Sequence, residues 1–497
     1  MNLASIIDPH PDEAVAIISR GQSTDYGTLR RQVAALRGAF IELGLEPGER
    51  LAIIAGNNWY FVVSYLAALG AGLVAVPLNP TNPAAAMAHE LRESGAAAIV
   101  ATPTARNALR AIDWETLPAV RLFMGAGFEP GPLGLQLDDL LAHEPGPVVE
   151  RSSDDLAVLI FTSGTAGAPR PAMLTHGNLY MNLRQVLASD DRVQEPDDVV
   201  FGLLPMFHIF GLNVMLGLSL MVGAAVLLIE RFDPVSALES VVKHRITTIA
   251  GPPTMWAAFA GLPGVTGDEL VSVRRAVSGA AKLPVEVAQA IEARFGLHLD
   301  EGYGLTEASP VVAAPVQGST PRGSVGLPVP GIEVRIVDPE GDDVLVGDHG
   351  ELLVKGPNVF AGYWEDPEAT ARVLTEDGWL RTGDVAVVDD DGYLFLVDRA
   401  KDLIIVSGFN VFPAEVEEVV LEHPAIEGCA VVGVPHPHTG ESVKAYVKAR
   451  DGMSIEEDDV IDFCADRLPH YKCPNKVWFV DEIPRGMGGK VIRRLLT

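Results

Sequence analysis

The chain has 497 residues, is 48% hydrophobic and 21% charged, and carries a formal net charge of −29. Its length predicts about three core units, its composition excludes a disordered chain, and its acidity disfavours nucleic acid and anionic membranes as partners. The three cysteines form no CxxC pair and no signal peptide is visible, so we expect a cytoplasmic protein without a disulfide scaffold.

The first 300 residues alternate between strand-like and helix-like segments. Short apolar runs predict strands at residues 51–55, 72–76 and 97–101, and residues 60–71 predict a helix. This alternation is typical of parallel sheets covered by helices.

One uncharged segment, residues 209–229, is long enough to cross a bilayer. Gly211, Gly217 and Gly223 interrupt it, and it lacks the basic flanks of a membrane span. We therefore expect a buried helix, a turn near Gly223 and a buried strand at residues 224–229.

A Gly/Ser/Thr-rich loop follows a buried strand that ends at Phe161 (LAVLIFTSGTAGAPRPAMLTHGN). Hydroxyl and N–H donors in such a loop can wrap phosphates, and a cation can neutralise their charge. The loop is not a Walker A loop, which needs GxxxxGK[ST]. Its composition alone fits an ordinary surface loop equally well. The candidate phosphate-binding residues are Thr162, Ser163, Gly164, Thr165, Gly167 and Arg170.

The segment DEGYGLTEASP at residues 300–310 provides three further kinds of group. Tyr303 offers an aromatic face for a base, and Thr306 offers a hydroxyl for phosphate. Glu307 offers a carboxylate, and Mg²⁺ usually takes one or two protein carboxylates together with nucleotide phosphates.

After about residue 323 the sequence changes to short strands separated by turn signals. Strands are predicted at residues 331–338, 350–355 and 384–388. Asp391-Gly392 lies between two apolar runs and is typical of a hairpin turn. This pattern predicts a smaller β-rich unit.

Three charged residues in the last part of the chain complete the candidate site. Asp384, in GWLRTGDVA, can accept hydrogen bonds from both ribose hydroxyls, and Arg399, in DRAK, can hold ribose or phosphate. Lys490 follows a Gly-rich turn, where a flexible loop can carry it into a cleft. Pro413 suits the first turn of a helix, so a C-terminal α+β unit is expected.

In this order, these five segments resemble the adenylate-forming superfamily of acyl-CoA synthetases, firefly luciferase and peptide-synthetase adenylation domains. The resemblance covers nearly the whole chain and is nearest to the fatty-acyl and aryl-CoA ligase branch. It implies an α/β fold with a large N-terminal domain of parallel-sheet α/β subdomains plus a β-rich subdomain, and a small mobile α+β C-terminal domain. The expected divisions are 1–398 (α/β to about 323, β-rich about 324–398), a hinge at 399–401, and 402–497.

The resemblance implies an ATP-dependent acid–thiol ligase that works through an acyl-adenylate, with Mg²⁺ as cofactor and ATP and CoA as co-substrates. Lys490 matches the catalytic lysine at the acyl carboxylate and α-phosphate, Glu307 matches the Mg²⁺ carboxylate, and Arg170 matches the cation of the phosphate loop. Asp384 and Arg399 match the ribose-binding pair. The remaining matched ATP-binding residues are Thr162, Ser163, Gly164, Thr165, Gly167, Gly302, Tyr303, Gly304 and Thr306.

Four positions match the family's hinge, CoA and acyl sites. Lys401 matches the hinge about which the C-terminal domain rotates between half-reactions. Gly408 matches the position that lines the family's pantetheine tunnel, where a side chain would block a thiol arm, although a turn glycine is also typical there. His208, in PMFHIFG, matches the family histidine beside the substrate carboxylate, although a histidine in an apolar run is often a core residue. Gly279 matches a position in the family's pocket wall.

The phosphate loop departs from the family at three positions. Ala166 replaces the usual threonine and removes a hydroxyl. Arg170 replaces lysine and changes the geometry of the charge, and Pro171 replaces glycine and removes an N–H. We expect altered rather than absent ATP use.

Two alternatives stay open: an acyl-AMP ligase that loads a carrier protein, and a degenerate member that binds nucleotide or acyl ligand without turnover. Amino-acid-activating relatives carry an aspartate near the position of His208, and this chain has none there. No carrier domain follows Lys490, and residues 331–355 leave no room for the insertion of fatty-acyl-AMP ligases. These features favour CoA as acceptor and an acid that is fatty or otherwise apolar. We expect small-molecule partners, no nucleic acid and no transmembrane span, and leave open whether the chain forms a homodimer.

Overall fold

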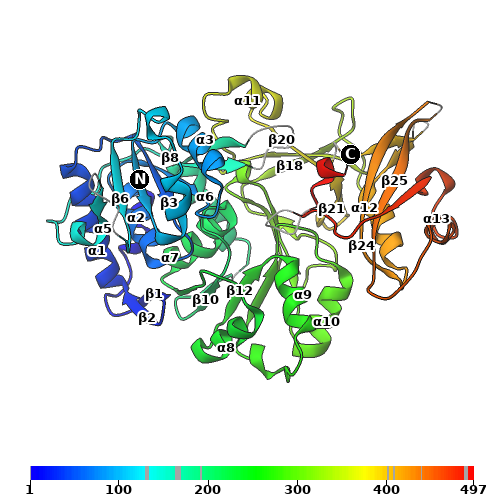
Figure 1. The fold of residues 1–497 in the computed structure, drawn as a ribbon, viewed down its shortest axis with the longest axis horizontal. Coiled ribbons are helices and arrows are strands. Elements are labelled where there is room, and N and C mark those ends of the chain that lie inside the picture. Colours follow the sequence, from blue (N-terminus) through cyan, green and yellow to red (C-terminus); the bar gives the residue numbers. More distant parts are fainter. Residues whose placement is uncertain are drawn as a thin grey trace.

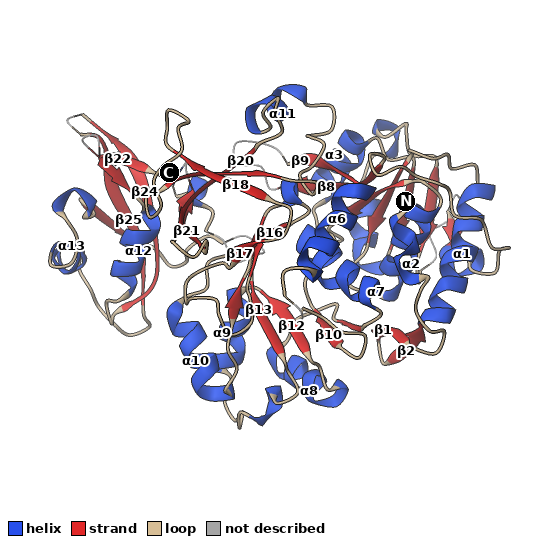
Figure 2. Ribbon diagram, turned by 180° about the vertical axis from the view of Figure 1, so that it is seen from behind, coloured by secondary structure: helices blue, strands red, loops and turns tan. Residues whose placement is uncertain are grey.

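The computed structural model describes residues 2–128, 134–162, 169–190, 193–399, 402–406, 409–437, 439–485 and 491–496, without the side chains of Arg399, Asn410 and Arg494. Within these residues the strands form five sheets (Figure 1). Two large sheets with their helices form the first 300 residues, and three smaller sheets follow toward the C-terminus (Figure 2). The predicted α/β fold class with a β-rich part and a small C-terminal domain is confirmed.

The first large sheet has seven strands in the order β7-β6-β5-β3-β4-β8-β9. All its pairs are parallel except β8–β9, which is antiparallel. Its strands are β3 (Arg50–Ile54), β4 (Val74–Leu78), β5 (Ala98–Ala101), β6 (Leu122–Gly125), β7 (Leu135–Gln136), β8 (Leu156–Thr162) and β9 (Arg170–Thr175). The three predicted strands are present, and β4 begins two residues later than predicted.

Helices cover both faces of this sheet because its central strands are apolar on both sides. Leu51 and Ile53 of β3 pack with α2 (Trp59–Gly70), whereas Ile54 packs on the opposite face with α3 (Ala84–Ser94). Successive side chains of a strand point to opposite faces, so a continuous apolar run must be covered twice.

The second large sheet has the order β14-β13-β12-β10-β11-β1-β2 and is parallel except for β1–β2. One face packs against Leu238, Trp256 and Ile291 of three helices, and the other face joins the core of the first sheet. The strands are β1 (Val15–Ser19), β2 (Gln22–Asp25), β10 (Val199–Gly202), β11 (Ala225–Leu228), β12 (Thr248–Gly251), β13 (Arg275–Ser278) and β14 (Asp300–Glu301). The helices are α8 (Pro234–His244), α9 (Pro253–Gly261) and α10 (Val285–Phe295).

The uncharged segment at residues 209–229 lies in this core. It forms a buried π-helix at Phe210–Gly217, continues as α7 (Leu218–Val222), turns at Gly223 with φ of +88°, and ends in β11. The predicted buried helix, glycine turn and strand are confirmed. Within the described residues no helix is both long and apolar enough to cross a membrane.

The β-rich part consists of two antiparallel sheets. A three-stranded sheet contains β15 (Tyr303–Gly304), β16 (Val311–Ala314) and β17 (Leu327–Pro328). A four-stranded sheet contains β18 (Glu333–Val337), β19 (Gly350–Lys355), β20 (Leu380–Val388) and β21 (Leu394–Arg399). The predicted hairpin turn joins β20 to β21, and Gly392 there has φ of +87°.

The last sheet has the order β23-β22-β25-β24, with β26 added parallel to β25. It lies beside β18 and β21 in both views (Figures 1 and 2), and Ala414 N–H donates to Asp398 Oδ2 across this junction at 2.8 Å. Its elements are β22 (Ile404–Val406), β23 (Phe409–Val411), α12 (Pro413–Leu421), β24 (Ile426–His436), β25 (Gly440–Ala449), α13 (Glu457–Ala465) and β26 (Lys476–Phe479).

The N-terminus is held by a buried histidine at the start of α6 (His176–Leu187). Leu3 N–H donates to His176 Nδ1 at 3.1 Å, and burial together with the charge of Arg151 lowers the pKa of His176 to about 4. The unfolded chain therefore binds a proton that the folded chain does not between pH 6.5 and about 4. The free energy of unfolding should fall by about 3 kcal/mol across this interval, since each pKa unit is worth about 1.4 kcal/mol.

We expect His176→Asn to reduce this acid sensitivity. The asparagine Oδ1 can still accept from Leu3 N–H but has no proton to gain. Urea unfolding midpoints of both proteins at pH 7 and pH 5 measure the effect. Equal losses in the two proteins would contradict it.

Candidate active site

Two candidate glycines follow the carboxyl ends of strands in the second sheet. Gly279 follows β13 and donates its N–H to Gly251 O at 3.2 Å, and Gly302 follows β14 and donates to Ser278 O at 3.1 Å. Ligands of open α/β sheets bind at this edge, outside the carboxyl ends of the strands. Both glycines therefore lie at the carboxyl edge of the second sheet.

Tyr303 and Asp384 come together although they lie 81 residues apart. The Tyr303 hydroxyl donates to Asp384 Oδ2 at 2.6 Å, and the two residues are only 8% and 6% exposed. Asp384 is fixed further because its N–H donates to Thr382 Oγ1 at 3.1 Å. This hydrogen bond brings together the two residues that are predicted to bind the base and the ribose, and those roles stay predictions.

Asp384 also faces Arg399 in the antiparallel pairing of β20 with β21. The backbone therefore brings the two predicted ribose-binding residues to neighbouring strands. The side chain of Arg399 lies outside the described residues. Gly304 is packed so closely that a Cβ atom there would collide with the carbonyl of Pro310, which explains glycine at this position.

Glu307 lies on the short 3₁₀ turn Thr306–Ala308 that follows β15. Tyr363 donates its hydroxyl to Glu307 Oε1 at 2.7 Å. Burial and the charge of Glu307 raise the pKa of Tyr363, so its hydroxyl keeps its proton and acts as donor at physiological pH. Among the described residues no hydrogen bond to Glu307 Oε2 is formed, so this oxygen can serve a hard cation such as Mg²⁺.

Arg170 stands at the first position of β9, the strand that leaves the phosphate loop. Its Nε donates to Asp366 Oδ2 at 2.9 Å, and Thr162 Oγ1 donates to the Arg170 carbonyl at 3.4 Å. The N–H of Ala369 and the side chain of Arg170 hold the pKa of Asp366 below its ordinary value. Arg170 is therefore engaged through Nε, and the other guanidinium nitrogens can still face a phosphate.

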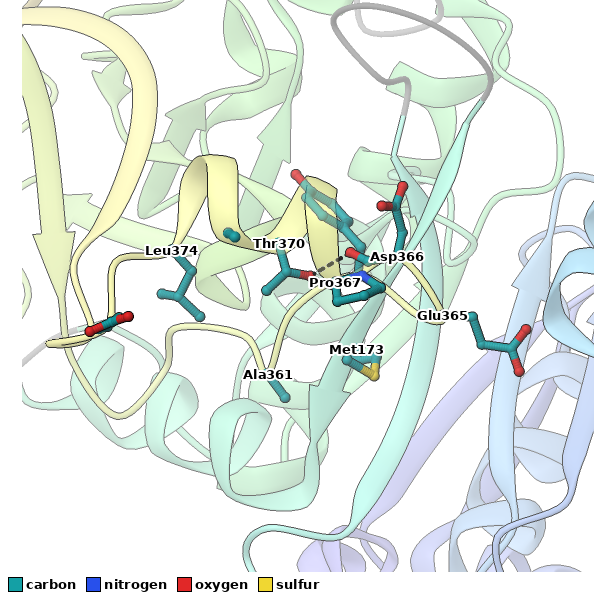
Figure 3. A pocket seen from close by; sticks show the side chains of 10 residues that line it. Met173, Ala361, Glu365, Asp366, Pro367, Thr370 and Leu374 are labelled. Atoms are coloured by element: carbon teal, nitrogen blue, oxygen red, sulfur yellow. Dashed lines mark hydrogen bonds between the residues drawn. The ribbon is translucent and has the colours of Figure 1, made fainter.

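A groove of about 480 Å³ lies beside the loop stem. It runs between Met173 of β9 and α11 (Pro367–Val373), and Asp366 and Thr370 project toward it (Figure 3). Its walls do not include Tyr303 or Asp384, so we do not assign it to the nucleotide.

Gly279 packs against Phe210, a residue that the sequence did not single out. A Cβ atom on Gly279 would lie 2.9 Å from the ring of Phe210, which is two residues after His208. His208 is an exposed residue, yet the surrounding protein desolvates its ring and lowers its pKa. Phe210 therefore packs against the Gly279 backbone, and His208 precedes Phe210 by two residues in the chain.

Several predicted site residues lie outside the described residues. Their predicted roles stay predictions, and so do the roles of Arg170, His208 and the other residues above. The undescribed positions are Ser163, Gly164, Thr165, Gly167, Lys401, Gly408 and Lys490. The departure at Ala166 is undescribed as well.

Comparison with known proteins identifies the class. A family model described as AMP-binding enzyme matches residues 5–364, and the AMP-binding enzyme C-terminal domain matches residues 415–490. The chain therefore belongs to the AMP-binding, adenylate-forming enzyme family, and within it the chain is an acid–thiol ligase of the acyl-CoA synthetase branch.

Three similar proteins illustrate this branch. A feruloyl-CoA synthase from Amycolatopsis sp. is 38% identical over 98% of this chain and 95% of its own length. A long-chain-fatty-acid–CoA ligase from Bacillus subtilis is 35% identical over 92% of this chain and 87% of its own. ATP-bound MatB from Rhodopseudomonas palustris superposes with a TM-score of 0.91 at 32% identity, covering 100% of this chain and 98% of MatB.

Proposed function

We propose that the protein activates an apolar carboxylic acid with Mg·ATP and transfers the acyl group to coenzyme A. In the first step a carboxylate oxygen attacks the α-phosphorus and diphosphate leaves. In the second step the CoA thiol attacks the acyl carbonyl carbon and AMP leaves. The buried Tyr303–Asp384 hydrogen bond is the observation that supports this best, because it brings together the residues assigned to base and ribose, and Tyr303 is four residues from Glu307 in the sequence.

The first step brings two anions together, so cations around the reacting atoms are needed to stabilise its transition state. Lys490 is assigned to the junction of carboxylate and α-phosphate, and Arg170 to the outer phosphates. Glu307 would hold Mg²⁺, which when bound neutralises phosphate charge and favours departure of diphosphate. Because acyl-AMP is itself the activated intermediate, the protein needs no nucleophile, and positioning supplies most of the remaining catalysis.

The acid class rests on the packing of Phe210 against Gly279. An aromatic ring and a bare glycine backbone offer an apolar surface, and the buried Met215 lies on the same π-helix as Phe210. Such a lining suits an acyl chain or aryl ring. Desolvation lowers the pKa of His208 and so favours its neutral form, in which a ring N–H can donate to a carboxylate or adenylate oxygen.

The division into residues 1–398 and 402–497 with a hinge at Lys401 is part of this proposal. The present pose is held by Ala414 and Asp398, by stacking of His349 on Phe412 at 5.3 Å, and by an ion pair between Lys282 and Glu418. These are contacts that a rotation can break without opening either apolar core.

Exchange of labelled diphosphate into ATP tests the acid class without involving CoA. Octanoate, palmitate and ferulate represent apolar acids, and malonate serves as the polar comparator. We expect at least one apolar acid to support exchange well above malonate. Exchange with malonate alone would contradict the assignment of an apolar acid while leaving adenylation intact.

A further inference from the structure

Glu307 is held at two points by one segment of chain, residues 360–366. Phe360 N–H donates to the Glu307 carbonyl at 2.8 Å, and the Tyr363 hydroxyl donates to Glu307 Oε1 at 2.7 Å. The backbone and the carboxylate of Glu307 are therefore both fixed by this segment. Tyr363, which makes the side-chain contact, lies 56 residues after Glu307 in the sequence.

This segment is itself fixed against β9. Met173 N–H donates to Gly362 O at 2.9 Å, Ala361 N–H donates to Met173 O at 3.0 Å, and Trp364 N–H donates to Pro171 O at 2.8 Å. The segment therefore pairs along the edge of β9, the strand that follows the phosphate loop.

The ring of Tyr363 has little freedom. Its own N–H donates to Thr370 Oγ1 at 2.9 Å, and its ring packs edge-on against Phe360 with centroids 5.0 Å apart. Its hydroxyl is thus presented to Glu307 from a rigid support. Three residues further on, Asp366 holds Arg170 through the same segment.

We propose that Tyr363 is a positioning residue for the metal carboxylate. It occupies Oε1 of Glu307 and orients the carboxylate so that Oε2 faces the Mg²⁺ of the bound nucleotide. The assignment rests on the proposed use of Mg·ATP. Groups that orient a metal ligand in this way typically change metal affinity by about 10- to 100-fold when they are removed.

The test is Tyr363→Phe, which removes only the hydroxyl. Equilibrium binding of ATP is measured calorimetrically as a function of Mg²⁺ concentration, and again with EDTA. We expect the Mg²⁺ concentration for half-saturation to rise about 10-fold or more, with ATP binding in EDTA unchanged.

The matched control is Tyr60→Phe, because the Tyr60 hydroxyl also donates to a carboxylate, Asp138 Oδ1, at 3.1 Å. This variant should leave the Mg²⁺ dependence unchanged. Thermal unfolding of both variants reports on the fold. If Tyr363→Phe lowers stability, the single variant Glu307→Gln is compared with the double variant Glu307→Gln/Tyr363→Phe. The two should show the same Mg²⁺ dependence of ATP binding, because the hydroxyl of Tyr363 acts through the Glu307 carboxylate.

The outcomes separate the inference from the proposed function. An unchanged Mg²⁺ dependence in Tyr363→Phe, with a normal response in the wild type, overturns the role of Tyr363 alone. An equal loss of ATP binding with and without Mg²⁺ overturns it too, because the hydroxyl would then act on the nucleotide site as a whole. If the wild-type protein binds ATP equally well with and without Mg²⁺, the assignment of Glu307 as a metal ligand is overturned, and this inference with it.

Discussion

Replacing Lys490 by alanine should reduce the rate of acyl-adenylate formation by about 10²–10³-fold. Losses of this size follow when an enzyme loses a group that stabilises the charge developing in the transition state. Only the first half-reaction brings a carboxylate onto a phosphate, so only this step needs a cation at their junction. Thioester formation from supplied acyl-AMP should stay largely intact. Diphosphate release and acyl-CoA formation from acyl-AMP, measured separately, give the two rates.

The control for this variant is Lys476→Ala, which removes an exposed lysine from β26 of the same C-terminal sheet. It should leave both half-reactions unchanged. Equal losses of adenylation and thioesterification in Lys490→Ala would contradict the assignment of separate poses to the two steps.

Asp384→Asn should instead impair both half-reactions. The ribose of AMP is present in each, and the substitution removes the charge that strengthens two hydrogen bonds to its hydroxyls. A hydrogen bond to a charged group is worth about 1.5–3 kcal/mol, so kcat/KM for ATP should fall about 10²-fold. Asparagine keeps the shape of the side chain and can still accept from the Tyr303 hydroxyl, which limits damage to the fold.

Asp391→Asn is the matched control, because Asp391 is an exposed carboxylate in the turn between β20 and β21. It should change neither rate. Loss of adenylation alone in Asp384→Asn would show that this carboxylate serves the attack on phosphate rather than the ribose.

Much of the fold could be predicted because the sequence pattern is local. Residues 51–55 are a continuous apolar run, and the structure buries alternate side chains under different helices. The segment at 209–229 could be assigned to the core because three glycines interrupt it and basic flanks are missing, and the structure shows Gly223 at a positive φ in the predicted turn. The strand predicted at residues 384–388 is shorter than the observed β20, Leu380–Val388. The polar residues at the start of β20 hid this part of the strand, although it pairs with β19.

The partners of the site residues could not be predicted, because they are set by tertiary packing. Tyr363 lies 56 residues from Glu307, and Asp366 lies 196 residues from Arg170. Phe210 was overlooked for another reason: an aromatic residue in an apolar run is indistinguishable from core until Gly279 is seen against it. One local signal was available, since Asp366-Pro367 is typical of a helix start, and it marks the segment that carries Tyr363.

The central claim is tested most directly by diphosphate release with Mg·ATP and a panel of carboxylic acids, each with and without coenzyme A. We predict release that depends on an apolar acid, with acyl-CoA and AMP appearing only when CoA is present. Release that never yields acyl-CoA would contradict CoA as the acceptor and point to a carrier protein, and no release with any acid would contradict the assignment of this chain as an active ligase.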